Sequence, residues 1–175
     1  EWKQVHSWPY GEVVFDLDLS PDSRLLSLSH SETSGRSSLK VMKVESLLAG
    51  DVTPVATFDF GASLPSNFVF SPDGQFLYGS SYYTGVSNLF RYDLASGKVT
   101  LLTDGKSRNS RGPWSTAGDR MAYTSTRRNG ADVDFYVIDP TNPSSNRMLA
   151  EVQGGGWGPM DWSPDDKWIV GGEYV

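Results

Sequence analysis

Phe70-Ser71-Pro72-Asp73-Gly74 has close copies elsewhere in the chain. Leu19-Ser20-Pro21-Asp22-Ser23 precedes it, Trp162-Ser163-Pro164-Asp165-Asp166 follows it, and a weaker copy is Trp114-Ser115-Thr116-Ala117-Gly118. The serines of successive copies lie 51, 44 and 48 residues apart. The chain is therefore built from internal repeats, and each repeat is expected to be one structural unit of that length.

Each copy of this phrase predicts a tight turn between two antiparallel strands. Proline presets φ for the second turn position, aspartate bonds back to the backbone, and glycine tolerates positive φ. An apolar residue ends the strand before the turn, as in Val13–Leu19, and an apolar stretch follows it. The strands that follow are predicted at residues 24–29, 75–80, 120–125 and 167–171.

The remainder of each repeat predicts two further strands. The third strands are expected at residues 38–44, 87–93 and 133–139, and the fourth strands at 52–58, 98–103 and 147–151. Residues 45–50 are expected to form one helical turn, and residues 140–145 a turn between strands. Four consecutive antiparallel strands with a period of about 40–50 residues are typical of a β-propeller blade.

The predicted fold is therefore all-β, a partial β-propeller of four-stranded antiparallel blades. A single domain, 1–175, would hold blades at about 11–61, 62–107 and 108–154 and an incomplete blade at 155–175, about three and a half in total. A β-sandwich is the alternative, but it does not require one turn phrase at a fixed point of each repeat.

The two ends of the chain do not complete a blade together. Residues 2–5 are expected to form the outer strand of a preceding blade, and the last repeat stops after its second strand. Unpaired strand edges favour association. We therefore expect either that the chain is a portion of a longer protein or that its open edges pair with a second copy.

Composition agrees with short strands joined by tight turns. Aromatic residues make up 13% of the chain, which also has 18 glycines and 10 prolines. The net charge of −6 argues against a nucleic-acid partner, which needs a basic face. No apolar run is long enough to span a membrane. The chain has no cysteine, which leaves both a periplasmic and a cytoplasmic location open.

Two resemblances follow from these residues. The Ser-Pro-Asp-Gly turn followed by an apolar strand resembles the repeat of TolB-type propellers. The second half of the chain resembles the N-terminal propeller of bacterial prolyl oligopeptidase family serine peptidases. The runs that carry this second resemblance are Tyr123-Thr124-Ser125-Thr126-Arg127-Arg128-Asn129-Gly130, Asp134-Phe135-Tyr136-Val137-Ile138-Asp139-Pro140 and Leu149-Ala150-Glu151-Val152-Gln153-Gly154-Gly155-Gly156-Trp157.

In the peptidase family a seven-bladed propeller lies over an α/β-hydrolase domain and limits which substrates reach the catalytic serine. The resemblance therefore implies a non-catalytic, substrate-gating and docking propeller. Its partners would be the remainder of a propeller, a hydrolase domain, and a peptide or protein ligand. The alternative is a TolB-type scaffold that binds proteins and has no enzymatic activity. A propeller that is itself a carbohydrate-active enzyme is a third reading.

The residues themselves give no catalytic triad. Acyl transfer on an α/β-hydrolase fold needs a Gly-x-Ser-x-Gly elbow, and the nearest match, Gly79-Ser80-Ser81-Tyr82-Tyr83, lacks the closing glycine. The two histidines, His6 and His30, are both predicted to be exposed. We therefore predict that the chain is not an enzyme by itself, with no catalytic residues and no cofactor.

Two pairs of aspartates are candidate calcium ligands. Asp16 with Asp18, and Asp132 with Asp134, each place two carboxylates on one face of a strand. The spaced Asp/Asn, central Gly and terminal Glu of a calcium loop are absent. A solvated strand face is the simpler prediction for both pairs, and no metal site is predicted.

The candidate partner-binding residues lie in loops between second and third strands. They are Tyr82, Tyr83, Arg127, Arg128 and Asn129. Loops carry function more often than the strands that they connect, and exposed Tyr and Arg side chains are frequent anchors for partners. Strand aromatics are instead predicted to fill the space between blades; these are Phe68, Phe70, Phe76, Trp114, Trp162 and Trp168.

Overall fold

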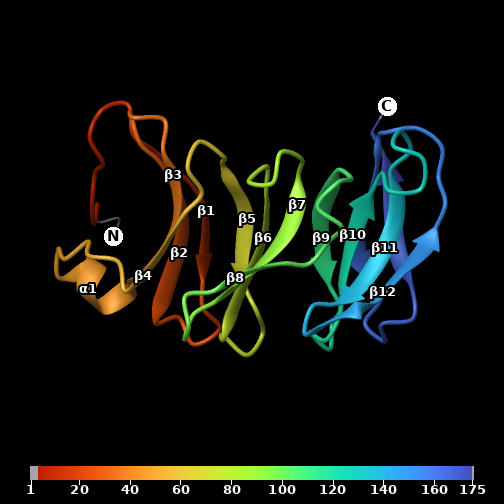
Figure 1. The fold of residues 1–175 in the computed structure, drawn as a ribbon. Coiled ribbons are helices and arrows are strands. Elements are labelled where there is room, and N and C mark those ends of the chain that lie inside the picture. The colour runs from red at the N-terminus through yellow and green to blue at the C-terminus, as the bar shows by residue number, and fades with distance from the viewer. Residues whose placement is uncertain (1–3, 175) are drawn as a thin grey trace. The chain divides into compact units, whose positions relative to one another are not determined.

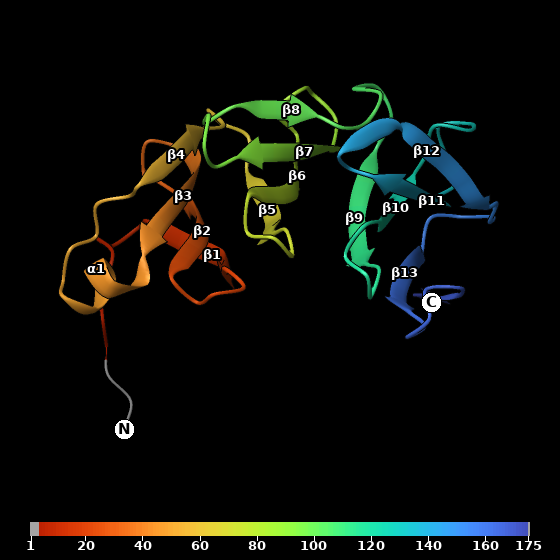
Figure 2. The same cartoon turned by 90° about the horizontal axis from the view of Figure 1, so that it is seen from below.

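The computed structural model of the protein describes residues 4–174, and within them the strands form three four-stranded sheets and one two-stranded sheet (Figure 1). Every sheet is an antiparallel meander in which the strands follow chain order (Figure 2). The first sheet contains β1 (Val13–Leu19), β2 (Leu25–Ser31), β3 (Ser37–Lys43) and β4 (Ala56–Asp59), with helix α1 (Val44–Leu48) before β4.

The second and third sheets repeat this strand order, and the fourth sheet contains, within the described residues, its first two strands only. The second contains β5 (Pro65–Phe70), β6 (Phe76–Ser81), β7 (Asn88–Asp93) and β8 (Val99–Leu101). The third contains β9 (Asn109–Trp114), β10 (Met121–Ser125), β11 (Asp134–Asp139) and β12 (Asn142–Ala150). The fourth contains β13 (Trp157–Trp162) and β14 (Ile169–Glu173).

The chain forms two compact units. The first holds the residues up to Tyr83 together with Arg91–Thr100, and the second holds Thr84–Phe90 together with the residues from Leu101 onward. In the first unit α1 packs on the first sheet through a buried cluster of Leu28, Met42 and Leu47. In the second unit the core of the third sheet is formed by side chains such as Met121, Tyr123 and Ile138.

The four repeated turns have the same hydrogen-bonded geometry, as predicted. The serine carbonyl accepts a bond from the N–H three residues later, and that residue has positive φ: Ser23 (59°), Gly74 (71°), Gly118 (72°) and Asp166 (55°). The serine hydroxyl accepts a bond from the N–H five residues later, in Leu25 (2.9 Å), Phe76 (3.0 Å), Arg120 (3.0 Å) and Trp168 (3.0 Å).

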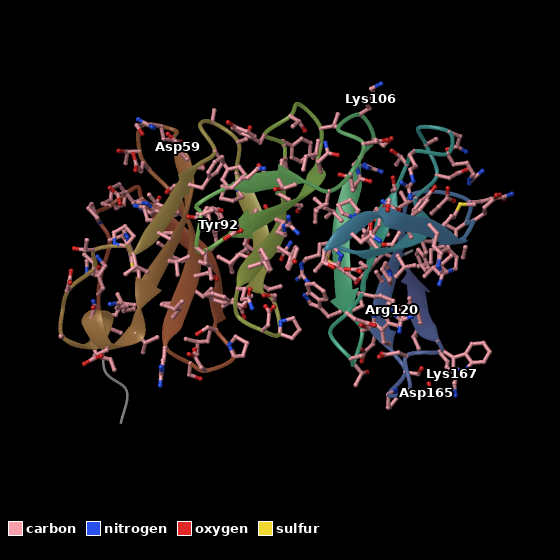
Figure 3. The ribbon with its side chains drawn as sticks, turned by 60° about the horizontal axis from the view of Figure 1, so that its bottom comes forward. Asp59, Tyr92, Lys106, Arg120, Asp165 and Lys167 are labelled. Atoms are coloured by element: carbon pink, nitrogen blue, oxygen red, sulfur yellow. The ribbon has the colours of Figure 1, made fainter. Side chains whose placement is uncertain are left out.

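The weaker third copy of the turn keeps its geometry through substitutes. In the other three copies the serine hydroxyl donates to the aspartate two residues later, at 2.5–2.7 Å. Ala117 stands at that position in the third copy, and Ser115 instead donates to Asp119 at 2.9 Å. The backbone N–H groups of Thr116 and Ala117 donate to the Asp166 carboxylate, at 2.6 and 2.8 Å. In the fourth copy Asp165 also pairs with Lys167 at 3.0 Å, and Figure 3 marks both residues.

A β-bulge interrupts the first strand of every sheet, a feature that the sequence did not predict. The register shifts between Phe15 and Asp18 in β1 and between Ser66 and Val69 in β5, and β9 and β13 shift in the same way. Asp16 and Asn67 occupy the bulges with φ near +55°. Asp and Asn tolerate this left-handed region better than other non-glycine residues.

Some predicted bounds differ from the structure. The strand expected at residues 52–58 begins only at Ala56, as β4. The turn expected at residues 140–145 is only Pro140–Thr141, because β12 begins at Asn142 and pairs with Asp139. Pro143 is compatible with this strand because β12 is an edge of its sheet. Of the strand expected at residues 2–5, Trp2 and Lys3 lie outside the described residues, and Gln4 and Val5 belong to no strand.

Two burial predictions are wrong. Trp168 is 71% exposed although it was expected to pack between blades, and it lies before β14, which begins at Ile169. His30 is 3% exposed although it was expected to be exposed. Its Nε2 lies 2.8 Å from Glu12 Oε2 and its Nδ1 lies 2.8 Å from Lys40 Nζ, so the histidine is a satisfied buried residue.

Candidate functional site

The predicted partner-binding residues belong to two loops, one in each compact unit. Tyr82 and Tyr83 follow β6 in the first unit, and Arg127, Arg128 and Asn129 lie between β10 and β11 in the second unit. The structure therefore groups the five residues as a pair and a trio.

The two tyrosines present aromatic surface to solvent. Tyr82 is 58% exposed and Tyr83 is 49% exposed. The Tyr83 ring lies edge-on to Phe58 and Phe60, with centroids 5.9 and 5.5 Å apart. These edge-to-face contacts orient the Tyr83 ring, whereas Tyr82 is the more accessible of the two.

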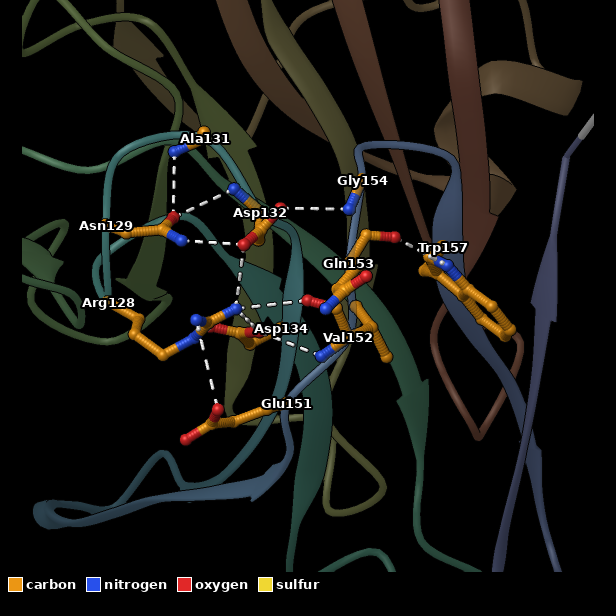
Figure 4. A network of polar contacts seen from close by, with 10 residues as sticks. All are labelled: Arg128, Asn129, Ala131, Asp132, Asp134, Glu151, Val152, Gln153, Gly154 and Trp157. Atoms are coloured by element: carbon orange, nitrogen blue, oxygen red, sulfur yellow. Dashed lines mark hydrogen bonds and ion pairs between the residues drawn. The ribbon is translucent and has the colours of Figure 1, made fainter.

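Arg128 holds the β10–β11 loop in place (Figure 4). Its guanidinium makes a bidentate contact with Asp134, from Nε to Oδ2 at 2.7 Å and from Nη2 to Oδ1 at 2.9 Å. Nη2 also donates to Asp132 Oδ2 and to the Val152 carbonyl, both at 3.0 Å, and Glu151 Oε2 lies 3.9 Å from Nη1. Three carboxylates thus surround one guanidinium.

The acidic partners of Arg128 also bind the connection between β12 and β13. Asp134 Oδ1 accepts the Val152 N–H at 3.0 Å, and Asp132 Oδ1 accepts the Gly154 N–H at 2.9 Å. Asn129 closes the loop, because its Oδ1 accepts the N–H groups of Ala131 and Asp132 and its Nδ2 donates to Asp132 Oδ2 at 2.6 Å. The loop and the connection therefore form one hydrogen-bonded assembly.

Hydrogen bonds and opposite charges in this assembly favour the charged forms of its side chains. The Arg128 guanidinium holds the pKa of Asp134 below its ordinary value, against the opposing effect of burial. The Gly154 N–H and the Asn129 amide hold the pKa of Asp132 below its ordinary value, and hydrogen bonding to Asp134 raises the pKa of Arg128. Both aspartates are therefore ionised at neutral pH.

The prediction of a solvated strand face is wrong for Asp134, whose side chain is fully buried. Its function in the structure is to pair with Arg128. Asp16 and Asp18 also act as hydrogen-bond acceptors, from Asn67 N at 2.8 Å and from Phe70 N at 2.7 Å. Across residues 4–174, no group of three or more His, Cys, Asp or Glu side chains is arranged to hold a metal ion.

Arg127 lies on an aromatic platform that the sequence did not predict. Its guanidinium carbon is 3.7 Å from the Tyr136 ring centroid and 5.9 Å from that of Tyr123. Its Nη2 donates to Asn146 Oδ1 at 2.5 Å, and the Tyr123 hydroxyl donates to the same oxygen at 2.7 Å. Burial raises the pKa of Tyr123 to about 12, so its hydroxyl remains a hydrogen-bond donor at neutral pH.

The comparisons with solved structures show the fold. The chain is 20% identical to a putative TolB from Agrobacterium tumefaciens, with a TM-score of 0.64 over 90% of this chain and 57% of that one. It is also 20% identical to TolB from Acinetobacter baumannii, with a TM-score of 0.63 over 90% of this chain and 37% of that one. It is 15% identical to a structure from a study of two prolyl endopeptidases, with a TM-score of 0.64 over 86% of this chain and 24% of that one.

These likenesses confirm the predicted fold, an all-β portion of a β-propeller with three four-stranded antiparallel blades and a two-stranded one. The chain spans between about a quarter and three fifths of the length of these structures. No protein-family model and no curated protein matches the chain. No helix within residues 4–174 has both the length and the apolar character needed to cross a membrane.

Proposed function

We propose that this chain is a non-catalytic propeller portion that docks a peptide or protein ligand and gates access to the hydrolase domain of a prolyl oligopeptidase-like serine peptidase. The observation that carries the proposal is the β10–β11 loop. Arg128 pairs with carboxylates that fix the position of the loop, while its neighbour Arg127 packs on Tyr136 without an acidic partner among the described residues.

A loop held in this way is suited to docking. Ordering a loop at the moment of binding costs free energy, and a loop that is already ordered avoids most of that cost. Asp132 and Asp134 accept hydrogen bonds from Gly154 N and Val152 N of the connection before β13, and these bonds fix the end of the loop that leads into β11. The fold likeness to a prolyl endopeptidase structure over 86% of this chain supports the peptidase context.

The gating proposal is tested on a polypeptide that carries residues 1–175 together with a hydrolase domain. We expect Arg128→Met to loosen the loop and to raise cleavage of a long prolyl polypeptide relative to a short chromogenic prolyl peptide. Arg108→Met, which removes an exposed cation from the same unit, is the matched control. An unchanged ratio in Arg128→Met would contradict gating by this loop.

The second candidate is a TolB-type scaffold that binds proteins and is attached to no enzyme. It is favoured by the likeness to the Agrobacterium tumefaciens structure, which extends over 90% of this chain. The coding sequence beyond Val175 separates the two candidates. A Gly-x-Ser-x-Gly elbow with His and Asp partners there supports the peptidase, and its absence from that sequence supports the scaffold.

A further inference from the structure

Two adjacent arginines of the β10–β11 loop differ sharply in how they are paired. Arg128 contacts the carboxylates of Asp132, Asp134 and Glu151. Arg127 forms no ion pair with any residue that the structure describes, and its side chain makes one hydrogen bond, to Asn146. A guanidinium has five N–H donors, so most of those of Arg127 are unused.

Asp104 does not neutralise Arg127. Hydrogen bonds from Ser107 and Lys106 lower the pKa of Asp104, the charge of Arg127 contributes least, and the two groups form no ion pair within the described chain. The Asp104 carboxylate is occupied by Ser107 Oγ at 2.6 Å, by Ser107 N at 2.9 Å and by Lys106 N at 3.0 Å. Arg127 is therefore a cation without a counter-charge of its own.

Arg127 is also held in position. The Tyr136 ring supports one face of the guanidinium at 3.7 Å, and Asn146 fixes one of its edges. Asn146 is itself oriented by the hydroxyl of Tyr123, a fully buried residue. A planar guanidinium fixed in this way offers parallel N–H groups that match the two oxygens of a carboxylate.

We propose that Arg127 binds a carboxylate of the docked peptide. The inference rests on the proposed docking function and adds the chemical class that the loop recognises. A carboxylate is favoured over a phosphate dianion because the whole chain carries a net charge of −6, which repels a dianion more strongly than a monoanion. The carboxylate can come from a peptide's C-terminus or from an Asp or Glu side chain.

The experiment titrates three acetylated peptides into the isotope-labelled chain. The first is an alanine tripeptide with a free C-terminus, the second is its C-terminal amide, and the third is an amide with aspartate at the central position. The readout is the NMR signal of the Arg127 Nε–H group together with the backbone amide signals. Arg127→Lys identifies the Arg127 signal and retains the positive charge.

The expected result is that the first or the third peptide shifts the Arg127 signal and the second does not, and the responding peptide identifies the source of the carboxylate. Arg127→Lys should weaken this binding by about tenfold, because lysine lacks the fork of parallel donors. Arg108→Lys, a substitution of an exposed arginine in the same unit, should leave it unchanged.

Two results overturn the inference, and they differ in what they say about docking. Equal shifts of the loop signals by all three peptides contradict carboxylate recognition and leave docking intact. The absence of shifts with every peptide contradicts both proposals. The amide spectrum of Arg127→Lys verifies that the variant is folded, so that lost binding is not mistaken for unfolding.

Discussion

The third sheet, β9–β12, and the last sheet, β13–β14, begin alike and end differently. Both have a bulged first strand, the same turn and a second strand in the same register, so that Met121 and Ile169 each lie opposite the tryptophan before the turn serine. Met121 is 1% exposed, and Ile169 is half-buried. One position further, Ala122 is 1% exposed and Val170 is 61% exposed.

This difference teaches that the repeated turn positions a strand but does not bury it. In the third sheet β11 and β12 follow β10, whereas no described strand follows β14. Because burial of apolar area provides most of the stability, the same sequence pattern has different energetic weight in the two sheets.

The largest expected effect comes from truncating the two matched positions. Met121→Ala should cost about 3 kcal/mol of unfolding free energy, because it leaves a cavity in a closed core. Ile169→Ala should cost about 1 kcal/mol, because its surroundings are partly solvent. Urea denaturation of both variants measures the two losses of unfolding free energy. Equal losses would show that the last sheet is as well packed as the third.

The next effect concerns the Arg128 network, which only the third sheet has. Arg128→Met should lower the unfolding free energy by clearly more than Arg127→Met, because it leaves the buried Asp134 carboxylate without its guanidinium; the partial exposure of Arg128, 29%, keeps the loss below that of a fully buried pair. Arg127→Met serves as the control in the same urea measurement. A smaller loss for Arg128→Met than for the control would contradict the assigned structural role.

A pH dependence follows from the same network. The pKa of Asp134 is lowered in the folded state, chiefly by Arg128, so its contribution to stability is complete above the ordinary carboxyl pKa of about 4 and is lost as the pH falls through the lower folded pKa. The urea midpoint of the native chain should therefore fall more steeply below pH 4 than that of Asp134→Asn. Parallel curves would show that other carboxylates dominate.

The smallest effect on stability is expected in the last sheet. Trp168→Ser and Val170→Thr replace exposed apolar side chains and should change the unfolding free energy by less than about 0.5 kcal/mol. Together they should reduce concentration-dependent association, because exposed apolar surface and a free strand edge favour it. Light scattering checks this, and a native chain that is already a monodisperse monomer would remove the self-association hypothesis.

The repeated turns could be predicted from the sequence, whereas contacts that occur in only one repeat could not. The turns could be predicted because each side chain bonds to a partner only a few residues away in the sequence, as Ser71 does to Asp73. The burial of Asp134 was missed because an aspartate in a strand suggests solvation unless its partner is known, although Arg128 lies only six residues earlier in the same hairpin.

The surroundings of the candidate loop were missed for a similar reason. The platform beneath Arg127 was not predicted, since Tyr136 and Asn146 come from β11 and β12 and meet Arg127 only through strand pairing. His30 was missed in the same way, because Glu12 and Lys40 reach it from either side of its strand. These contacts depend on register, which bulges and turn lengths decide.

The divergent third turn has a consequence for redesign of the repeat. Restoring the common phrase would place proline at Thr116 and aspartate at Ala117. The proline would remove an N–H that Asp166 now accepts, and the new aspartate would set a second negative charge beside that carboxylate. Consensus substitution, which often strengthens repeat proteins, would here weaken a contact between two neighbouring repeats that the irregular copy makes.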